Sequence, residues 1–409
     1  MVTTRHRLLG ALVLALALTS CGGNSTAPPA DDGPDPVGTI TTWAGTGSAG
    51  FNGENIARQQ IQMYWPNDIE FTPTLGTFIV DWNNHRIRRV DASGRVNTVL
   101  GTNSIGDGPP PPNVGDDVSP PGWPGRECDL NHPTQVLERQ NGKLLVVCWH
   151  NHKLREWDPI TGRETVLVGR GAGCTGDGET VSSPNVLMSQ PPHVVEAPDG
   201  SLYINDQRNH CIRKIDPSGV MSTVVSTPQC DPQDPNNFFP GGFSGDGGPP
   251  ALARLHQPSG PNPNPPGGGL TLDDQGRLYV ADTMNHRIRR IDFNADVINT
   301  VVGNGTAAYA GDGGDPLQAS LNVPLDICFG PDGRLYIADT YNHAVRAVDF
   351  DANVIVTVAG TGVRGFSGDG GPATSAKLAL PYGVAFNAEG HLFITDTYNH
   401  RIRRVKMHD

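Results

Sequence analysis

The stretch Leu335-Tyr-Ile-Ala-Asp-Thr-Tyr-Asn-His343 returns in related form along nearly the whole chain. Each copy ends in the same step, and the six steps are Asn84-His85, Asn151-His152, Asn209-His210, Asn285-His286, Asn342-His343 and Asn399-His400. Self-similarity with a period of several tens of residues indicates a repeat architecture. The pattern therefore predicts six copies of one structural unit.

The unit around this stretch has the pattern of four short strands. Apolar segments over 325–329, 334–338, 345–348 and 354–359 alternate with turn sequences such as Pro331-Asp-Gly333. Short strands joined by tight turns form an antiparallel meander. One such sheet cannot bury both of its faces, so six of them should pack around an axis. We therefore expect an all-β fold, a six-bladed β-propeller with four-stranded antiparallel blades.

The two ends of the repeat region support this architecture. The sixth unit stops after its third strand, near 401–405, while residues 40–45 match the fourth strand of the fifth unit at 355–360. We therefore expect the N-terminal strand to complete the last blade. Such a closure leaves no exposed strand edge in the ring.

The Asn-His step after the second strand of each unit resembles the signature of NHL repeats. The resemblance covers nearly all of the chain from residue 38 onward, and it implies a six-bladed propeller over 38–409. This family includes proteins of varied function, so the fold by itself does not assign one.

The N-terminus resembles a bacterial lipoprotein signal peptide. Arg5 and Arg7 precede an apolar run over 8–18, and Leu18-Thr-Ser-Cys21 follows directly. The run is too short to cross a bilayer core. The resemblance implies removal of residues 1–20, lipid attachment to Cys21 and a flexible tether over 21–37. We expect a lipid-anchored protein of the bacterial cell envelope, with Gly22 favouring the outer membrane; the alternative is an ordinary secreted protein.

The charge balance bears on the possible partners. The chain has 30 Lys and Arg against 42 Asp and Glu, a formal net charge of −12. Nucleic acids bind mainly through clustered basic residues, so a nucleic acid is an unlikely partner. Membrane contact is expected through the lipid anchor only, and the sequence leaves the oligomeric state open.

Six further cysteines follow Cys21, and export would permit them to form disulfides. Six cysteines allow fifteen pairings. Positions on neighbouring strands favour a bond between Cys211 and Cys230. Cys128 could pair with Cys148 or Cys174, and Cys148 stands where the other units have the turn Asp. Cys328 is expected to be a buried thiol.

Unequal spacing of the repeats indicates insertions. In a meander the Asn-His turns and the connections between blades share one face, so the insertions should crowd that face, and their ranges are 106–127, 170–189, 227–255 and 258–268. A loop-rich rim over a regular scaffold is where binding sites usually lie.

The starts of the innermost strands should line the central channel. This place holds Asp68, Gln135, His193, Asp326 and Gly383 in units one, two, three, five and six. The first four are candidate ligand-binding residues. Asp68, His193 and Asp326 fall on alternate units and could hold a metal such as zinc. The alternative is that these side chains hydrogen-bond channel waters and strand ends.

Two repeated motifs have structural explanations as well as chemical ones. The six signature histidines lie on different blades, too far from the axis to bind one ion, so each is expected to pack against a neighbouring blade. Five Gly-Asp-Gly connections recur at 106–108, 176–178, 245–247, 311–313 and 368–370. They could bind calcium, but their low carboxylate density favours a structural turn.

These observations favour a binding or scaffolding module over an enzyme. Its partner would be an envelope protein, a peptide or a carbohydrate, and sugar recognition could involve Trp43, Trp65, Trp82, Trp123 and Trp149. The alternative function is that of a metal-dependent enzyme of the lyase or lactonase kind. It rests on similarity to a six-bladed amidating lyase that holds zinc with channel histidines, of which only His193 has a counterpart here. No cofactor is required by the sequence.

Overall fold

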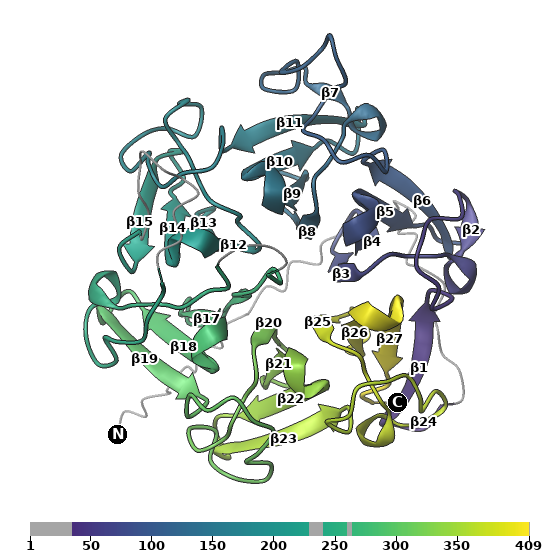
Figure 1. Ribbon diagram of the computed structural model, residues 1–409, viewed down its shortest axis with the longest axis vertical. Coiled ribbons are helices and arrows are strands. Elements are labelled where there is room, and N and C mark those ends of the chain that lie inside the picture. Colours follow the sequence, from purple (N-terminus) through teal and green to yellow (C-terminus); the bar gives the residue numbers. More distant parts are fainter. Residues whose placement is uncertain (1–34, 229–239, 260–263, 409) are drawn as a thin grey trace, which may run out of the picture.

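The computed structural model describes residues 35–228, 240–259 and 264–408. Six antiparallel sheets are arranged like blades around a central axis (Figure 1). Apart from three-residue 3-10 helices, the described residues form strands, turns and loops. The chain is therefore an all-β, six-bladed propeller, as the repeat pattern predicted.

Each blade has four main strands, taken from the innermost outward. Blade one contains β3 (Pro66–Thr72), β4 (Gly76–Asp81), β5 (Arg86–Val90) and β6 (Arg95–Leu100). Blade two contains β8 (Pro133–Glu138), β9 (Leu144–Cys148), β10 (Lys153–Trp157) and β11 (Arg163–Val168). Blade three contains β12 (Val194–Glu196), β13 (Leu202–Asp206), β14 (Cys211–Ile215) and β15 (Met221–Val225).

The remaining blades follow the same order. Blade four contains β16 (Leu270–Leu272), β17 (Leu278–Asp282), β18 (Arg287–Asp292) and β19 (Val297–Val302). Blade five contains β20 (Pro324–Phe329), β21 (Leu335–Asp339), β22 (Ala344–Asp349) and β23 (Val354–Ala359). Blade six contains β25 (Pro381–Phe386), β26 (Leu392–Asp396), β27 (Arg401–Val405) and β1 (Thr39–Ala44).

The last blade is closed by the N-terminal strand, as expected. β1 runs antiparallel to β27, with Ile40 opposite Val405 and Thr42 opposite Arg403. The expected strands of blade five also agree with the structure to within one residue at each end. The hydrophobic pattern was sufficient here because the second and third strands of blade five are almost entirely buried.

The expected position of the insertions is wrong for much of their length. The connection before each innermost strand first runs along the outer edge of its own blade and only then returns to the channel. Short added strands mark this path in three blades, and they are β2 (Ile56–Ala57), β7 (Trp123–Pro124) and β24 (Gly371–Pro372). Pairing with the outermost strand satisfies backbone groups that a loop standing above the face would leave to solvent.

The hydrophobic core is divided into six layers, one between each pair of adjacent blades. Blades five and six, for example, meet through Tyr336, Val345, Val384 and Ile394, which are almost completely buried. Because both faces of each sheet are covered, the second strand of each blade is a nearly continuous apolar run.

The signature histidines link the blades. Each one follows a 3-10 turn, has a left-handed backbone with φ between 50 and 57°, and accepts a hydrogen bond at Nδ1 from the next blade. The donors are backbone N–H groups at 3.0–3.3 Å, those of Trp65, His132, Gln190, Gln257, Val323 and Leu380. The expectation that these histidines are structural is confirmed, since all six serve one repeated contact.

The Asp and Asn of the signature complete the turn in five blades. In blade five, Asp339 accepts hydrogen bonds from the Asn322 backbone N–H and the Asn342 side chain and forms a buried ion pair with Arg346 at 3.3 Å. Arg346 also pairs with Asp312 of the Gly-Asp-Gly connection at 2.6 Å. Equivalent pairs recur around the ring, so the Gly-Asp-Gly carboxylates bind arginine.

Blade two lacks this arrangement because Cys148 replaces the signature Asp. Asn151 accepts the hydrogen bond from the Asn131 backbone N–H that the Asp would otherwise receive. Arg155 instead contacts three carboxylates, those of Asp107, Asp117 and Glu164. The same turn is therefore built with a different set of polar contacts.

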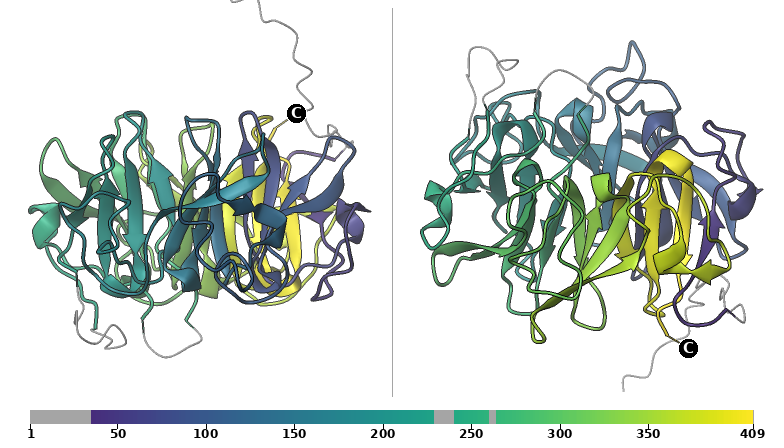
Figure 2. Two further views of the ribbon diagram at one scale, coloured as in Figure 1. Left: turned by 90° about the horizontal axis from the view of Figure 1, so that it is seen from above. Right: turned by 60° about the horizontal axis from the view of Figure 1, so that its bottom comes forward.

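Two faces of the ring can now be distinguished. The Asn–His face carries the six signature turns and the starts of the innermost strands. The opposite face carries both described chain ends, because β27 finishes there and the Gly38 backbone N–H donates to the Lys406 carbonyl oxygen at 2.7 Å. Figure 2 shows the C-terminus on one side of the ring of blades.

Candidate functional site

The four candidate ligand-binding residues do encircle the channel near the Asn–His face. Asp68, Gln135 and Asp326 occupy the same register on their innermost strands, opposite Val80, Val147 and Ala338 of the second strands. His193 takes this place in blade three, where its carbonyl oxygen accepts from the Asn205 N–H. Reading the register from the sequence was sufficient to find this ring.

All four side chains bind the backbone of the next blade. The contacts are Val136 N to Asp68 Oδ2 at 3.3 Å, Val194 N to Gln135 Oε1 at 2.7 Å, Leu270 N to His193 Nδ1 at 3.2 Å and Val384 N to Asp326 Oδ2 at 2.9 Å. Part of their role is therefore structural, because they hold innermost strands together where the blades converge.

Glycine occupies the ring position in blades four and six. A Cβ on Gly269 would come within 2.6 Å of Asp326 Oδ1, and one on Gly383 within 2.8 Å of the Asn67 carbonyl oxygen. Second-strand side chains also link blades near these glycines: Asn205 of blade three donates to the Gly267 and Gly268 carbonyl oxygens, and Thr395 of blade six donates to the Asn67 carbonyl oxygen of blade one.

A small recess lies inside this ring. Its enclosed volume is about 20 Å³, which is room for about one water molecule. The polar side chains that line it include Asn67, Asp68, Thr134, His193 and Asp326. A ligand larger than one water-sized group would therefore extend out of the recess onto the mouth.

Two buried oxygens at the recess have no hydrogen-bond donor among the described residues. They are Asn67 Oδ1 and Asp326 Oδ1. The nearest ring nitrogen to the latter is His193 Nε2, at 3.4 Å, which is longer than a normal hydrogen bond. Buried acceptors are nearly always satisfied in folded proteins. The recess therefore favours a bound group that donates hydrogen bonds.

The channel below the recess is acidic. Burial, and then the neighbouring Glu70 and Asp326, raise the pKa of Asp68 to about 8. Burial and then Asp326 and Glu138 raise the pKa of Glu70 to about 7. Like charges in a low-dielectric space oppose each other's ionisation. A cation at the recess would relieve this repulsion and lower both pKa values.

Aromatic side chains form an arc beside the recess, over blades six and one. Trp65 stacks on Tyr398 with ring centroids 5.0 Å apart, and Tyr398 lies 6.1 Å from Tyr382, which lines the recess. Trp65 also contacts Trp82 at 5.8 Å. We call Trp65, Trp82, Tyr382 and Tyr398 the mouth aromatics.

The tryptophans named from the sequence fall into two groups. Trp65 and Trp82 belong to the mouth aromatics, and Trp149 lies beneath them, 1% exposed and 5.9 Å from Trp82. Trp43 packs instead against Phe71 and Phe393 in the core between blades six and one. Trp123 lies on β7 at the outer edge of blade two. A surface shared by all five tryptophans does not form.

The described residues contain no group of three His, Cys, Asp or Glu side chains that could hold a metal ion. Asp68, His193 and Asp326 lie at one level of the channel, but His193 uses Nδ1 for the Leu270 backbone and two of the carboxylate oxygens bind other backbone N–H groups. The residues present therefore do not fit the zinc site considered above.

The preferred disulfide between Cys211 and Cys230 is wrong, because Cys211 is a free thiol. Its side chain is completely buried at the start of β14. Burial is the main cause that raises the pKa of this thiol; the neighbouring Asp206 raises it further, and Arg213 lowers it. Cys230 lies outside the described residues.

The pairings suggested for Cys128 are also wrong. Cys128 and Cys148 are both free and buried, and the Cys128 thiol donates to Glu164 Oε1 at 2.9 Å. Burial and Glu164 raise the pKa of Cys128 far above its ordinary value. Cys328 is free and partly buried, whereas Cys174 is not among the free thiols.

Comparison with known proteins first defines the class. Among solved structures, an auxiliary nutrient binding protein from Bacteroides thetaiotaomicron superposes with a TM-score of 0.59 at 15% sequence identity, covering 89% of this chain and 75% of that one. At this identity the likeness shows the fold alone, a β-propeller.

The repeats are then identified directly. The family model described as NHL repeat matches residues 268–291, 321–347 and 378–405. The chain therefore carries NHL repeats, as the resemblance implied.

Two curated proteins are similar in sequence to about two thirds of this chain. The chain is 27% identical over 286 residues to Protein SUPPRESSOR OF QUENCHING 1, chloroplastic, from Arabidopsis thaliana, covering 68% of this chain and 25% of that protein. It is 26% identical over 295 residues to NHL repeat-containing protein 2 from Bos taurus, covering 68% of this chain and 38% of that protein. The chain thus spans well under half the length of both relatives.

The expected lipidation site, Cys21, and the expected signal peptide lie outside the described residues. In the parts of the chain that the structure describes, no helix combines the length and the apolar character that crossing a membrane requires.

Proposed function

We propose that the propeller is a ligand-binding module whose site is the channel mouth on the Asn–His face. The ligand would be a small molecule or peptide end that carries a protonated amine next to a flat or apolar group. The observation that carries this proposal is the pair of unsatisfied acceptors, Asn67 Oδ1 and Asp326 Oδ1, beside the mouth aromatics.

The recess favours an ammonium group for reasons of size and charge. Its volume of about 20 Å³ admits one small polar group. An ammonium carries three donors and no acceptor, so it can satisfy both orphan oxygens without creating a new unsatisfied group. A hydrogen bond to a charged partner contributes about 1.5–3 kcal/mol, more than a neutral one. The acidic channel adds attraction for the same charge.

The mouth aromatics favour a flat or apolar body above the recess. Trp65 and Tyr398 are partly exposed and stacked, so they present an aromatic surface next to the charged group. Cations near aromatic faces gain about 0.5–1 kcal/mol at exposed sites. Ligand sites commonly combine such apolar walls with a few polar groups that fix orientation.

A matched pair of probes tests the proposal. Isothermal titration calorimetry with 2-phenylethylamine should show binding, whereas 2-phenylethanol, which has the same ring without the charge, should bind at least tenfold more weakly. Binding of the amine should also release protons near pH 8, because a cation beside Asp68 lowers a pKa that stands at about 8. Equal affinities for the two probes would contradict the proposal.

Two substitutions locate the site. Asp326→Asn keeps an acceptor for the Val384 backbone but removes the charge, so amine affinity should fall at least tenfold. Tyr398→Ala should weaken binding by several-fold through lost stacking. Asp349→Asn and Tyr309→Ala, which change a partly exposed and an exposed residue away from the channel, are the matched controls and should bind as the wild type does.

We further propose that the module is anchored in a bacterial envelope through Cys21. Both described chain ends lie on the face opposite the mouth, so a tether at the N-terminus would leave the mouth pointing away from the membrane. Cell fractionation tests this: Cys21→Ser should move the protein from the membrane to the soluble fraction, and unchanged membrane association would argue against a lipid at this residue.

A further inference from the structure

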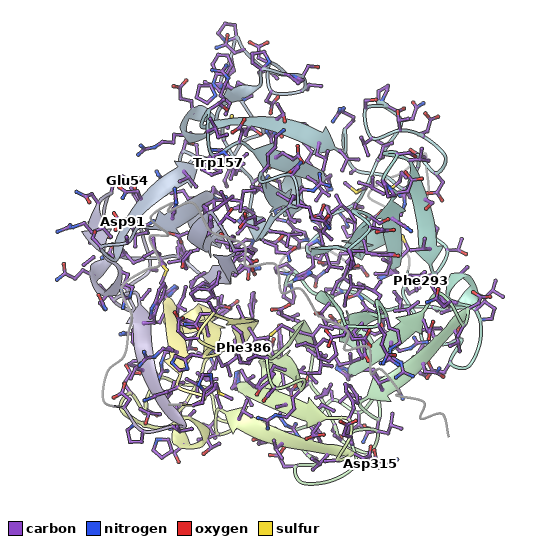
Figure 3. All side chains as sticks on the ribbon, turned by 180° about the vertical axis from the view of Figure 1, so that it is seen from behind. Glu54, Asp91, Trp157, Phe293, Asp315 and Phe386 are labelled. Atoms are coloured by element: carbon purple, nitrogen blue, oxygen red, sulfur yellow. The ribbon has the colours of Figure 1, made fainter. Side chains whose placement is uncertain are left out.

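A second cavity among the described residues is separate from the channel. It is a cleft between blades one and two with a volume of about 530 Å³. Its walls come from the ends of β4, β5 and β10, the outer strand β6 and the 3-10 helix Gly125–Glu127. Trp157 of blade two and Asp91 at the end of β5 in blade one, both labelled in Figure 3, line the cleft. A space of this volume is typical of sites for small organic ligands.

Two arginines in this cleft have no carboxylate partner. Arg89 and Arg126 line the cleft, and neither forms an ion pair with a described residue, although the whole chain is acidic. The one carboxylate in the lining, Asp91, uses Oδ1 to accept from the Ser93 N–H, the Ser93 hydroxyl and the Arg95 N–H. One of its two oxygens is therefore held by its own turn.

Neighbouring charges increase the positive potential of the cleft. Burial, then Arg88 and least of all Arg126, lower the pKa of the Arg86 guanidinium, so Arg126 lies near that group. Arg86 is itself paired with Glu54 at 3.3 Å, which leaves Arg126 and Arg89 as the cations of this region without an ion-pair partner among the described residues. An anion bound between them would remove an unfavourable like-charge interaction.

In blades two and six the charge at the same strand position is paired. Arg89 stands opposite Asn97 on β6, and its counterpart in blade two, Glu156, pairs with Arg139 and Lys143. The counterpart in blade six, Arg404, pairs with Asp35. Blade one differs because its charge faces a cavity. The cleft wall also holds Trp157, whose buried Nε1 has no acceptor among the described residues.

We propose that the cleft between blades one and two is a second binding site, one for a small organic anion. The anionic group, a carboxylate or a phosphate, would be held by the two guanidinium groups of Arg89 and Arg126. Guanidinium groups match both anions through paired N–H donors. The volume exceeds that of an inorganic anion, so the ligand should carry a body of about the size of a sugar.

Calorimetry with related sugars tests this site. D-glucuronate and D-glucose 6-phosphate should bind, while D-glucose, which lacks the anionic group, should bind at least tenfold more weakly. Affinity for the anionic sugars should also fall as salt is raised from 50 to 300 mM, because salt screens the guanidinium charges. Comparing the two anionic sugars shows which anionic group the site prefers. Citrate serves as a third anionic probe. If citrate and both anionic sugars fail to bind, the proposal is wrong.

Substitutions in the cleft give the decisive comparison. Arg126→Gln changes an exposed residue and should weaken binding at least tenfold, and Arg89→Gln combined with it should abolish binding. The control, Arg95→Gln with Arg290→Gln, removes two charges outside the cleft, and Arg290 occupies the position of Arg89 in blade four. Unchanged binding in the cleft variants would overturn the proposal. Amine binding at the mouth should be unaffected in all of them, so the two proposals can fail separately.

Discussion

Blades two and five reach the same backbone shape with different polar contacts. In blade five, Asp339 and Asp312 flank the buried Arg346. In blade two, the Cys148 thiol replaces the first of these carboxylates. Arg155 binds two buried carboxylates, Asp117 and Glu164, that have no counterpart in blade five. The difference shows that what the turn requires is a neutralised arginine behind it, and that the source of the negative charge can change.

The largest expected effect comes from removing that arginine in each blade. Arg155→Met should destabilise the protein by about 5 kcal/mol and Arg346→Met by about 3 kcal/mol, since breaking a buried ion pair leaves an uncompensated carboxylate. The effect is larger in blade two because Asp117 and Glu164 are both buried. Urea unfolding measures both losses of stability. The control is Arg334→Met, which breaks the partly exposed ion pair with Asp332 on blade five. Equal losses at the two sites would contradict the comparison.

A smaller effect should follow from restoring the signature in blade two. Cys148→Asp adds a carboxylate to a buried site where Arg155 is already neutralised, so it should cost about 2 kcal/mol.

Combining this change with Glu164→Ile, which introduces the residue found at the matching position in blade five, Ile355, should recover most of that loss. A double-mutant cycle on unfolding free energies measures the coupling. Strictly additive losses would show that the two carboxylates do not compete for Arg155.

The smallest expected effect concerns pH. Burial lowers the pKa of His85 and His152 to about 4 and that of His132 to about 3. The unfolded chain then binds more protons as pH falls from 6.5 towards 4, so these histidines make the fold less stable in acid. The signature Asp residues act oppositely: burial raises the pKa of Asp339 to about 6, so protonation between pH 6 and 3.8 favours the folded state.

Blade two has buried histidines but lacks the signature Asp, whose protonation would offset their effect. The packing between blades one and two should therefore be the part of the fold that acid destabilises most. His150 contacts His132 at 3.0 Å between the Nδ1 atoms, and its pKa is lowered to about 4, mainly by burial. His150→Phe should therefore reduce the fall in melting temperature between pH 7 and 5 by a few degrees. His408→Phe, at the exposed chain end, should leave that fall unchanged.

The fold could be predicted from the sequence because it depends on a local pattern. The strands of blade five and the pairing of residues 40–45 with the last blade follow from apolar periodicity and one repeated turn. The ring of Asp68, Gln135, His193 and Asp326 followed from the register that this repeat sets.

The features that were missed depend on contacts between distant residues. The sequence could not show that Glu164 and Asp117 would replace the signature Asp of blade two, so Cys148 was taken for a disulfide partner. It could not show that connections run along the blade edges, nor that Arg89 and Arg126 would line the same cleft. These outcomes are decided by packing between blades, which a single repeat does not encode.

The closure of blade six has a consequence for the order in which the protein is made. β1 pairs with β27, so Ile40 cannot pair with Val405 until that residue has been synthesised. At about 5–20 residues per second, this delay is on the order of tens of seconds. During that time β1 has no partner strand, and its sequence, Thr-Ile-Thr-Thr-Trp-Ala, is rich in strand-forming residues. A chaperone or an export factor that holds the first residues of the emerging chain would therefore protect the segment that must later complete the ring.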